Sequence, residues 1–227
     1  MAGPVGICAY CGELRELTDD HVPPRLLLEE PYPDNLITVP ACERCNRGFQ
    51  RDDEYTRDMV ALDFRAGRNA AAAAKVPKVF RSLQRPESKR YRTYFGSQLQ
   101  PTDLVDPSGR PLSLRASPDR ARIENTGKHI MRGMHFHFAQ QPLPADANVF
   151  SYSKPGYDSI DFIVERLTRL YEQAGARRDG AIGNGFSYAA ASFGDVFIYL
   201  FLLYEYFWWM VVALPPHVKI PGLTDAE

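Results

Sequence analysis

Four cysteines near the start of the chain have the spacing of a metal site. They form two Cys-x-x-Cys pairs, Cys8 with Cys11 and Cys42 with Cys45. A two-residue spacer lets a tight turn aim both sulfurs at one ion, and four thiolates are the usual tetrahedral set for structural zinc. Two disulfides are the alternative. We expect an intracellular chain, in which metal binding is the better interpretation.

Between the two pairs lie residues suited to hydrolysis. The stretch TDDHVPPRLLL sets Asp20 and His21 side by side, and Pro23 and Pro24 prevent a helix from continuing through them. Phosphodiester hydrolysis needs an activated water and a Lewis acid, and a histidine can supply the first and an oxygen-liganded metal the second. A histidine that only caps or packs a turn is the alternative for His21.

The segments CAYC, DHVPP, DNLITVP and CERCN together resemble the HNH endonuclease family in its zinc-stabilised, treble-clef form. The resemblance covers roughly residues 8–60. It implies a ββα-metal fold, in which two strands and a helix hold a catalytic divalent ion beside the structural zinc. It also implies His21 as the general base, Asp20 and Asn46 as ligands of that ion, and Asn35 as a brace for the loop that holds His21.

The chain departs from the family pattern on the expected helix. Many members have His where this chain has Asn46, or a further His or Lys a few residues on, and NRGFQRDDE supplies neither. Asp53 or Glu54 could help from the same helix. Asp and Asn oxygens are hard ligands that suit Mg²⁺ or Mn²⁺ and leave positions open for water and phosphate. Arg47 and Arg51 are the candidates for phosphate contacts, with a plain surface role as the alternative.

Charge is unevenly distributed, although the formal net charge of the 227 residues is -1. Residues 1–54 contain five Arg against eleven acidic residues, whereas residues 65–133 contain fifteen basic residues against five acidic ones. A basic segment can bind a polyanion such as DNA, and a solvated surface is the alternative. We therefore expect DNA as the partner.

The apolar pattern predicts an α+β protein in two parts. Residues 1–60 are expected to form the zinc-stabilised module, with a short strand at NLITVP and, after Cys45, a helix that ends at Gly67 and buries Phe64. Residues 61–227 are expected to form a larger mixed helix and sheet domain. That part could serve targeting or regulation, or could bind a protein partner or a second copy of the chain.

Further elements are predicted within the second part. They are a weak helix interrupted by Pro77, short strands joined at Asp106–Gly109, a helix with Ile123, Ile130, Met131, Met134 and Phe138 on one face, and a helix from about Asp158 to Gly175. His129 and His217 carry no readable signal. His135 and His137 are two residues apart and so not on one helix face, and we assign no site to them.

The run Val196–Leu214 is long enough to cross a bilayer. Glu205 at its centre and the aromatic residues in its middle argue against a membrane span. We predict two buried strands with a break near Tyr204–Glu205. The start of the chain has no secretory signal pattern, so a cytoplasmic location without a membrane is expected.

These residues predict a metal-dependent endonuclease that hydrolyses phosphodiester bonds in DNA, with structural Zn²⁺ and catalytic Mg²⁺ or Mn²⁺. The alternative is an inactive zinc-bound module that binds nucleic acid or a protein.

Overall fold

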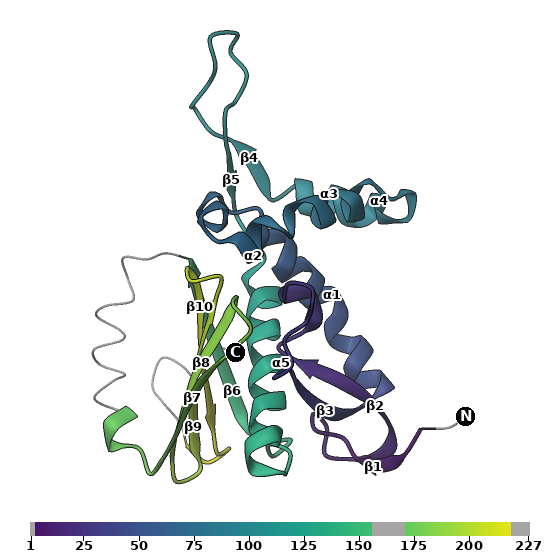
Figure 1. Cartoon of the computed structure of the whole chain (residues 1–227), viewed down its shortest axis with the longest axis vertical. Helices are drawn as coiled ribbons and strands as arrows, with labels where there is room; N and C mark the ends of the chain where they lie inside the picture. Colours follow the sequence, from purple (N-terminus) through teal and green to yellow (C-terminus); the bar gives the residue numbers. More distant parts are fainter. Residues whose placement is uncertain (1–2, 156–170, 219–227) are drawn as a thin grey trace.

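The computed structural model describes residues 3–155 and 171–218, which form a mixture of helices and antiparallel sheets (Figure 1). The strands are β1 (Val5–Ile7), β2 (Leu14–Val22), β3 (Ile37–Cys42), β4 (Leu99–Pro101), β5 (Leu114–Ala116), β6 (Asn148–Pro155), β7 (Ala176–Ile182), β8 (Phe186–Phe193), β9 (Val196–Leu203) and β10 (Phe207–Leu214). The α-helices are α1 (Glu43–Ala61), α2 (Ala70–Ala73), α3 (Val76–Gln84), α4 (Lys89–Gly96) and α5 (Arg120–Ala139). This confirms the α+β class.

Residues 3–61 form a small antiparallel sheet followed by a helix. The strand order is β1-β2-β3, and β3 runs directly into α1 at Cys42, whose backbone is still extended. Along β2 the side chains alternate, so Asp20 and Val22 are buried while His21 is partly exposed. The strand predicted at NLITVP is confirmed as β3.

The predicted bounds of the helix after Cys45 and the predicted burial of Phe64 are wrong. Helix α1 begins at Glu43, so it contains Cys45, and it ends at Ala61, before the predicted end at Gly67. A separate 3-10 helix, Phe64–Arg68, follows because the side chain of Asp63 accepts a hydrogen bond from the backbone N–H of Arg65 and starts a new turn. Phe64 is therefore 81% exposed.

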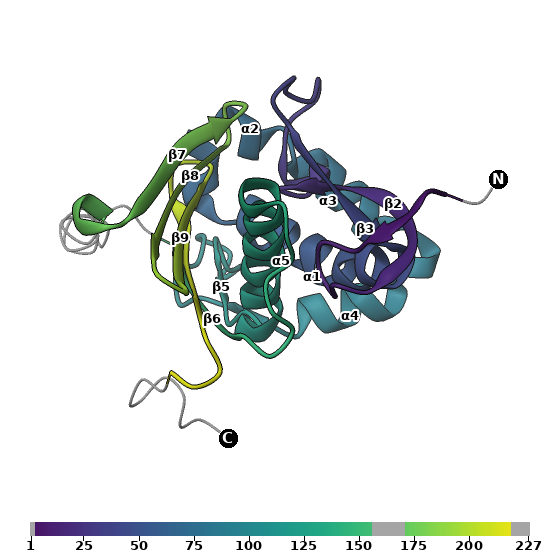
Figure 2. The same cartoon turned by 90° about the horizontal axis from the view of Figure 1, so that it is seen from below.

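Helix α5 is the central element of the molecule (Figures 1 and 2). It lies between the α1 and β2–β3 unit on one side and a five-stranded sheet of order β6-β10-β9-β8-β7 on the other. Two glycines permit this close packing: a Cβ at Gly127 would lie 2.8 Å from Trp209 Cδ1, and a Cβ at Gly133 would lie 2.5 Å from Val22 Cγ2. Buried side chains of both parts form one continuous core cluster.

The apolar run Val196–Leu214 forms two adjacent strands, as predicted. Strands β9 and β10 pair antiparallel, and Tyr204 and Glu205 in the turn between them adopt φ values of 53° and 64°. Trp209 is fully buried and donates a hydrogen bond from Nε1 to the carbonyl of Ile123 in α5. Among the helices that the structure describes, none combines the length and the hydropathy needed to cross a membrane.

The segment between α1 and α5 carries three short α-helices, α2, α3 and α4, and an arm. The predicted interruption near Pro77 is confirmed: α2 ends at Ala73 and α3 begins at Val76, with Pro77 in its first turn. The predicted turn at Asp106–Gly109 is confirmed, and it lies on the hairpin arm that β4 and β5 begin (Figure 1). The helix predicted between Asp158 and Gly175 falls mostly outside the described residues.

Candidate functional site

The four cysteines come together into one cluster. The Sγ atoms of Cys8, Cys11, Cys42 and Cys45 all lie within 4.8 Å of one another. Cys8 and Cys11 flank the turn between β1 and β2, while Cys42 ends β3 and Cys45 lies in the first turn of α1. Within the described residues, this is the one group of three or more His, Cys, Asp or Glu side chains close enough to share an ion.

The surroundings of Cys8 favour the thiolate that a zinc ion requires. The backbone N–H of Cys42 donates to Cys8 Sγ over 3.3 Å. Burial alone would raise the pKa of Cys8, but the backbone N–H groups of Cys42, Cys11 and Tyr10 outweigh it and lower the pKa to about 7. The donor set and its geometry therefore fit a tetrahedral metal such as zinc, and the cluster could hold one.

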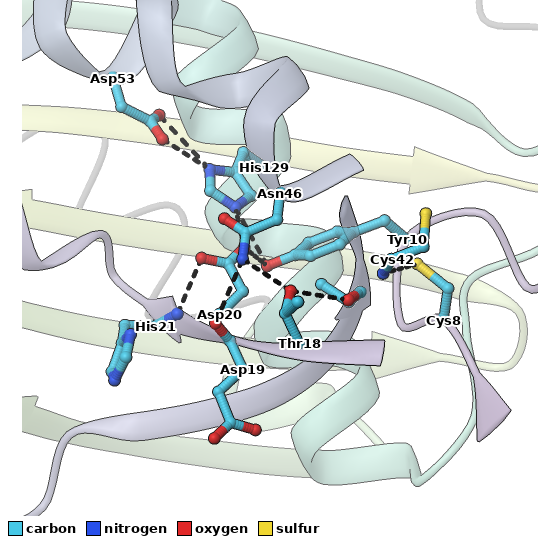
Figure 3. A network of polar contacts seen from close by, with 11 residues as sticks. Cys8, Tyr10, Thr18, Asp19, Asp20, His21, Cys42, Asn46, Asp53 and His129 are labelled. Carbon is cyan, nitrogen blue, oxygen red and sulfur yellow. Dashed lines mark hydrogen bonds and ion pairs between the residues drawn. The ribbon is translucent and has the colours of Figure 1, made fainter. Parts of the chain in front are cut away.

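Asp20 and His21 lie near the end of β2, one strand residue apart and on opposite faces. Asp20 is 8% exposed and its carboxylate faces α1 and α5, whereas the His21 ring points away from it (Figure 3). Burial, and next the charge of Arg25, lower the pKa of His21. A general base must start without a proton, so a lowered pKa suits that role at neutral pH.

A buried hydrogen-bond network surrounds Asp20 (Figure 3). Its Oδ2 atom lies 2.7 Å from the Tyr10 hydroxyl and 2.9 Å from Nε2 of His129, and its Oδ1 atom accepts the backbone N–H of His21 over 2.8 Å. On the far side of the imidazole, Nδ1 of His129 lies 3.1 Å from Oδ2 of Asp53. Both oxygens of Asp20 are therefore satisfied by protein groups.

Phe49 explains part of the departure from the expected metal-ligand pattern on α1. Its ring stacks on His129 with centroids 4.0 Å apart and an interplanar angle of 11°, and it meets Tyr10 edge-on at 4.9 Å. An apolar ring on this turn of α1 thus covers the imidazole that α5 supplies. The histidine that reaches Asp20 therefore comes from α5 and not from α1.

The two predicted asparagines have different neighbours. Nδ2 of Asn46 donates to Thr18 Oγ1 over 3.1 Å and to the Asp19 carbonyl over 3.2 Å, so the first turn of α1 is tied to β2 beside Asp20. Asn35 is exposed, and its Nδ2 donates to the carbonyl of Ala181 in β7 over 2.7 Å. The structure therefore brings Asn46 to the site, while the hydrogen bond of Asn35 ties the β2–β3 connection to the five-stranded sheet.

The two predicted phosphate-binding arginines lie on the outer face of α1. Arg47 is 77% exposed at its side chain and pairs with Glu43 across 2.8 Å, and Arg51 is exposed on the next turn. Both are accessible to a polyanion.

No local pattern in the sequence points to His129, the residue at the centre of the network. Its partners Asp53 and Asp20 are 76 and 109 residues away in the chain, and the imidazole is 2% exposed. A single histidine on an apolar helix face carries no local spacing pattern. Asp53 was a candidate ligand, and its position next to His129 could be inferred only from the packing of α1 on α5.

Comparisons with protein-family models, with curated proteins and with solved structures give no match to this chain.

Proposed function

We propose that this protein is a zinc-stabilised, metal-dependent endonuclease of the HNH type that hydrolyses phosphodiester bonds in DNA. The observation that carries the proposal is the placement of Asp20 and His21 at the end of β2, against the first turn of α1, next to the four-cysteine cluster. Zinc held by these cysteines fixes the hairpin β2–β3 to α1. The order of two strands and a helix is the one that the sequence resemblance implies.

His21 is the general base in this proposal. Its ring is partly exposed, and its lowered pKa leaves it able to take a proton from water at neutral pH. A divalent cation held by Asp20 and Asn46 would supply Lewis acidity at the phosphate. To hold it, Asp20 has to exchange its hydrogen bond with His129 or Tyr10 for the cation, because both carboxylate oxygens are engaged. Arg47 and Arg51 contact the phosphate backbone from the exposed face of α1.

Cleavage of supercoiled plasmid tests this function. Wild type, His21→Ala and the matched control His217→Ala are compared at equal concentration and zinc content, in Mg²⁺, Mn²⁺ or EDTA. His217 is exposed near the end of the described chain. We expect metal-dependent nicking that is lost in His21→Ala and retained in His217→Ala. Equal cleavage by His21→Ala and wild type would exclude His21 as the base.

A second candidate function is a zinc-bound module that binds nucleic acid without cutting it. The engagement of Asp20 favours it: the residue is 8% exposed, and its carboxylate, bonded to Tyr10, His129 and the His21 backbone, is satisfied without a cation. In that case the network is a structural joint between β2 and α5.

Binding without cleavage would distinguish the two candidates. A salt-sensitive mobility shift of DNA, with intact plasmid in Mg²⁺, Mn²⁺ and Ni²⁺, is the result expected of the binding module. Cleavage that disappears in Asp20→Ala, in protein shown to be folded and zinc-loaded, would exclude it.

A further inference from the structure

A cavity of about 160 Å³ lies between the C-terminal turns of α5 and the strands β7, β8 and β9. It is on the sheet side of α5, whereas the cysteine cluster and His21 belong to the unit on the other side of that helix (Figures 1 and 2). The cavity is therefore separate from the candidate nuclease site, and what it binds is a question independent of the proposed function.

The strand register explains why there is space at this place. Across three neighbouring strands, Arg178 pairs with Ala190, and Ala190 pairs with Tyr199. Neighbouring strands are about 4.8 Å apart, so the backbones of Arg178 and Tyr199 are roughly 10 Å apart with only a methyl group between them. The next row on the same face, Ala176–Ser192–Phe197, is also small at its centre. Two rows with short central side chains thus leave a hollow, and the long side chains around it are Arg178, Tyr199 and Phe197.

Two largely buried side chains that line this hollow carry polar groups. His135 and Tyr199 are each 4% exposed. Because both side chains line the cavity, their polar atoms are available to water or to a ligand there. Burial, and next the charge of Arg132, lower the pKa of His135, so its neutral ring offers one donor and one acceptor.

The remaining walls are aromatic, with one cation at the rim. The ring of Phe197 meets His135 edge-on at 4.5 Å, and the guanidinium of the exposed Arg178 lies 5.0 Å from the ring centroid of Phe138. Contact with the ring face holds the guanidinium at the entrance. The cavity therefore combines apolar walls, two hydrogen-bonding groups in its depth and a positive charge at its mouth.

We propose that this cavity binds a carboxylate carried on a single aromatic ring. A cavity of about 150 Å³ accommodates one benzene ring, which matches the volume present here. The ring lies over Ala190 and against Phe197, the carboxylate pairs with Arg178, and a polar substituent on the opposite side of the ring bonds to His135 and Tyr199. 4-Hydroxybenzoate has this chemistry and is the probe.

Calorimetric titration of the full-length protein with 4-hydroxybenzoate tests the proposal. We expect saturable binding at one site per chain. Arg178→Gln, at an exposed position where folding is not at risk, is expected to weaken binding at least tenfold. The matched control Arg177→Gln, on the neighbouring residue of the same strand, is expected to leave it unchanged. Uncharged 4-hydroxybenzamide is expected to bind wild type at least fivefold more weakly and to be insensitive to Arg178→Gln.

A second variant, Ala190→Leu, fills the centre of the hollow and is expected to abolish binding, with its folding checked by thermal unfolding. No saturable binding by wild type would overturn the proposal. Equal binding by wild type and a folded Ala190→Leu protein would place the ligand elsewhere and would also overturn it. Unchanged affinity in Arg178→Gln would overturn recognition of the carboxylate.

Discussion

Nε2 of His129 lies 2.9 Å from Oδ2 of Asp20, and the two residues belong to α5 and β2. On its other side the same imidazole meets Asp53 of α1. One buried ring thus joins three elements that lie far apart in the sequence. Breaking such a network by removing one member leaves buried polar groups unsatisfied, which is strongly destabilising. His129 is therefore the joint between the cysteine-containing unit and the helix that carries the large sheet.

Because His129 interacts with the carboxylates of Asp20 and Asp53, the stability of the protein should fall at alkaline pH. Burial alone would lower the pKa of His129, but the charges of Asp53 and Asp20 outweigh it and raise the pKa to about 9. In the unfolded chain the pKa of a histidine is about 6.5. At a pH between these two pKa values, His129 is therefore protonated in the folded protein and deprotonated in the unfolded chain. The stabilisation is complete below about pH 6.5 and is lost as the pH rises through about 9.

Urea unfolding of wild type and His129→Gln at about pH 6 and about pH 9.5 measures this contribution. We expect the difference in unfolding free energy between the two proteins to shrink by on the order of 3 kcal/mol at the higher pH. Titrating groups that do not interact with His129 change both proteins alike and cancel in the difference. A difference that does not depend on pH would mean that His129 is neutral in the folded protein.

Metal removal should unfold the cysteine-containing unit. Four thiolates within 4.8 Å of one another join the β1–β2 turn, the end of β3 and the start of α1. For so small a unit, metal binding free energy is largely folding free energy. We expect about one zinc per chain in wild type and less than about a tenth of that in Cys45→Ser. The unfolding free energy of that variant should fall by several kcal/mol.

Elemental analysis and circular dichroism measure these two effects, with His217→Ala as a control that should retain both zinc and stability. Full stability of a zinc-free wild-type protein would contradict the structural role of the metal.

Local patterns in the sequence were enough to predict β3, α5, the two strands in Val196–Leu214 and the grouping of the cysteines. Each depends on residues close in sequence: an alternation of period two, an apolar helical face, or a two-residue spacer. The end of α1 was placed too late because the apolar residue Phe64 continues the helical spacing, although Asp63 starts a separate turn. His129 could not be predicted because its importance comes from tertiary packing alone.

The packing of α5 on β2 should respond sharply to a single methyl group. A Cβ at Gly133 would lie 2.5 Å from Val22 Cγ2 and 3.1 Å from the Tyr10 hydroxyl, so Gly133→Ala should destabilise the protein by about 1–3 kcal/mol through overpacking. Gly48 in α1 is the matched control, because a Cβ there meets nothing within 4 Å. Gly48→Ala should stabilise the protein by up to about 1 kcal/mol, since alanine has the higher helix propensity.

Thermal or urea unfolding of the two alanine variants gives the comparison directly. Opposite signs are the expected result. Equal stability of Gly133→Ala and wild type would contradict the close packing of α5 on β2 at Gly133.

Helices α3 and α4 should carry part of the DNA-binding surface, in either of the two proposed functions. Helix α3 is tied to the loop that follows His21: Lys78 Nζ lies 3.0 Å from Glu30 Oε1, and Lys75 Nζ donates to the carbonyl of Leu28. Beyond this contact, Arg85 and Arg90 are exposed. Exposed arginines on this segment can contact the phosphate backbone.

The double variant Arg85→Glu with Arg90→Glu tests this surface in a DNA-binding titration at several salt concentrations. If both side chains contact phosphates, affinity at low salt should fall at least tenfold, and the slope of log K against log salt should become shallower by about one for each lost contact. Arg177→Glu changes an exposed arginine of β7 and should leave both quantities as in wild type. The slope counts the phosphates that the protein contacts directly. An unchanged slope in the double variant would therefore show that Arg85 and Arg90 contact no phosphate, and would exclude α3 and α4 from the interface.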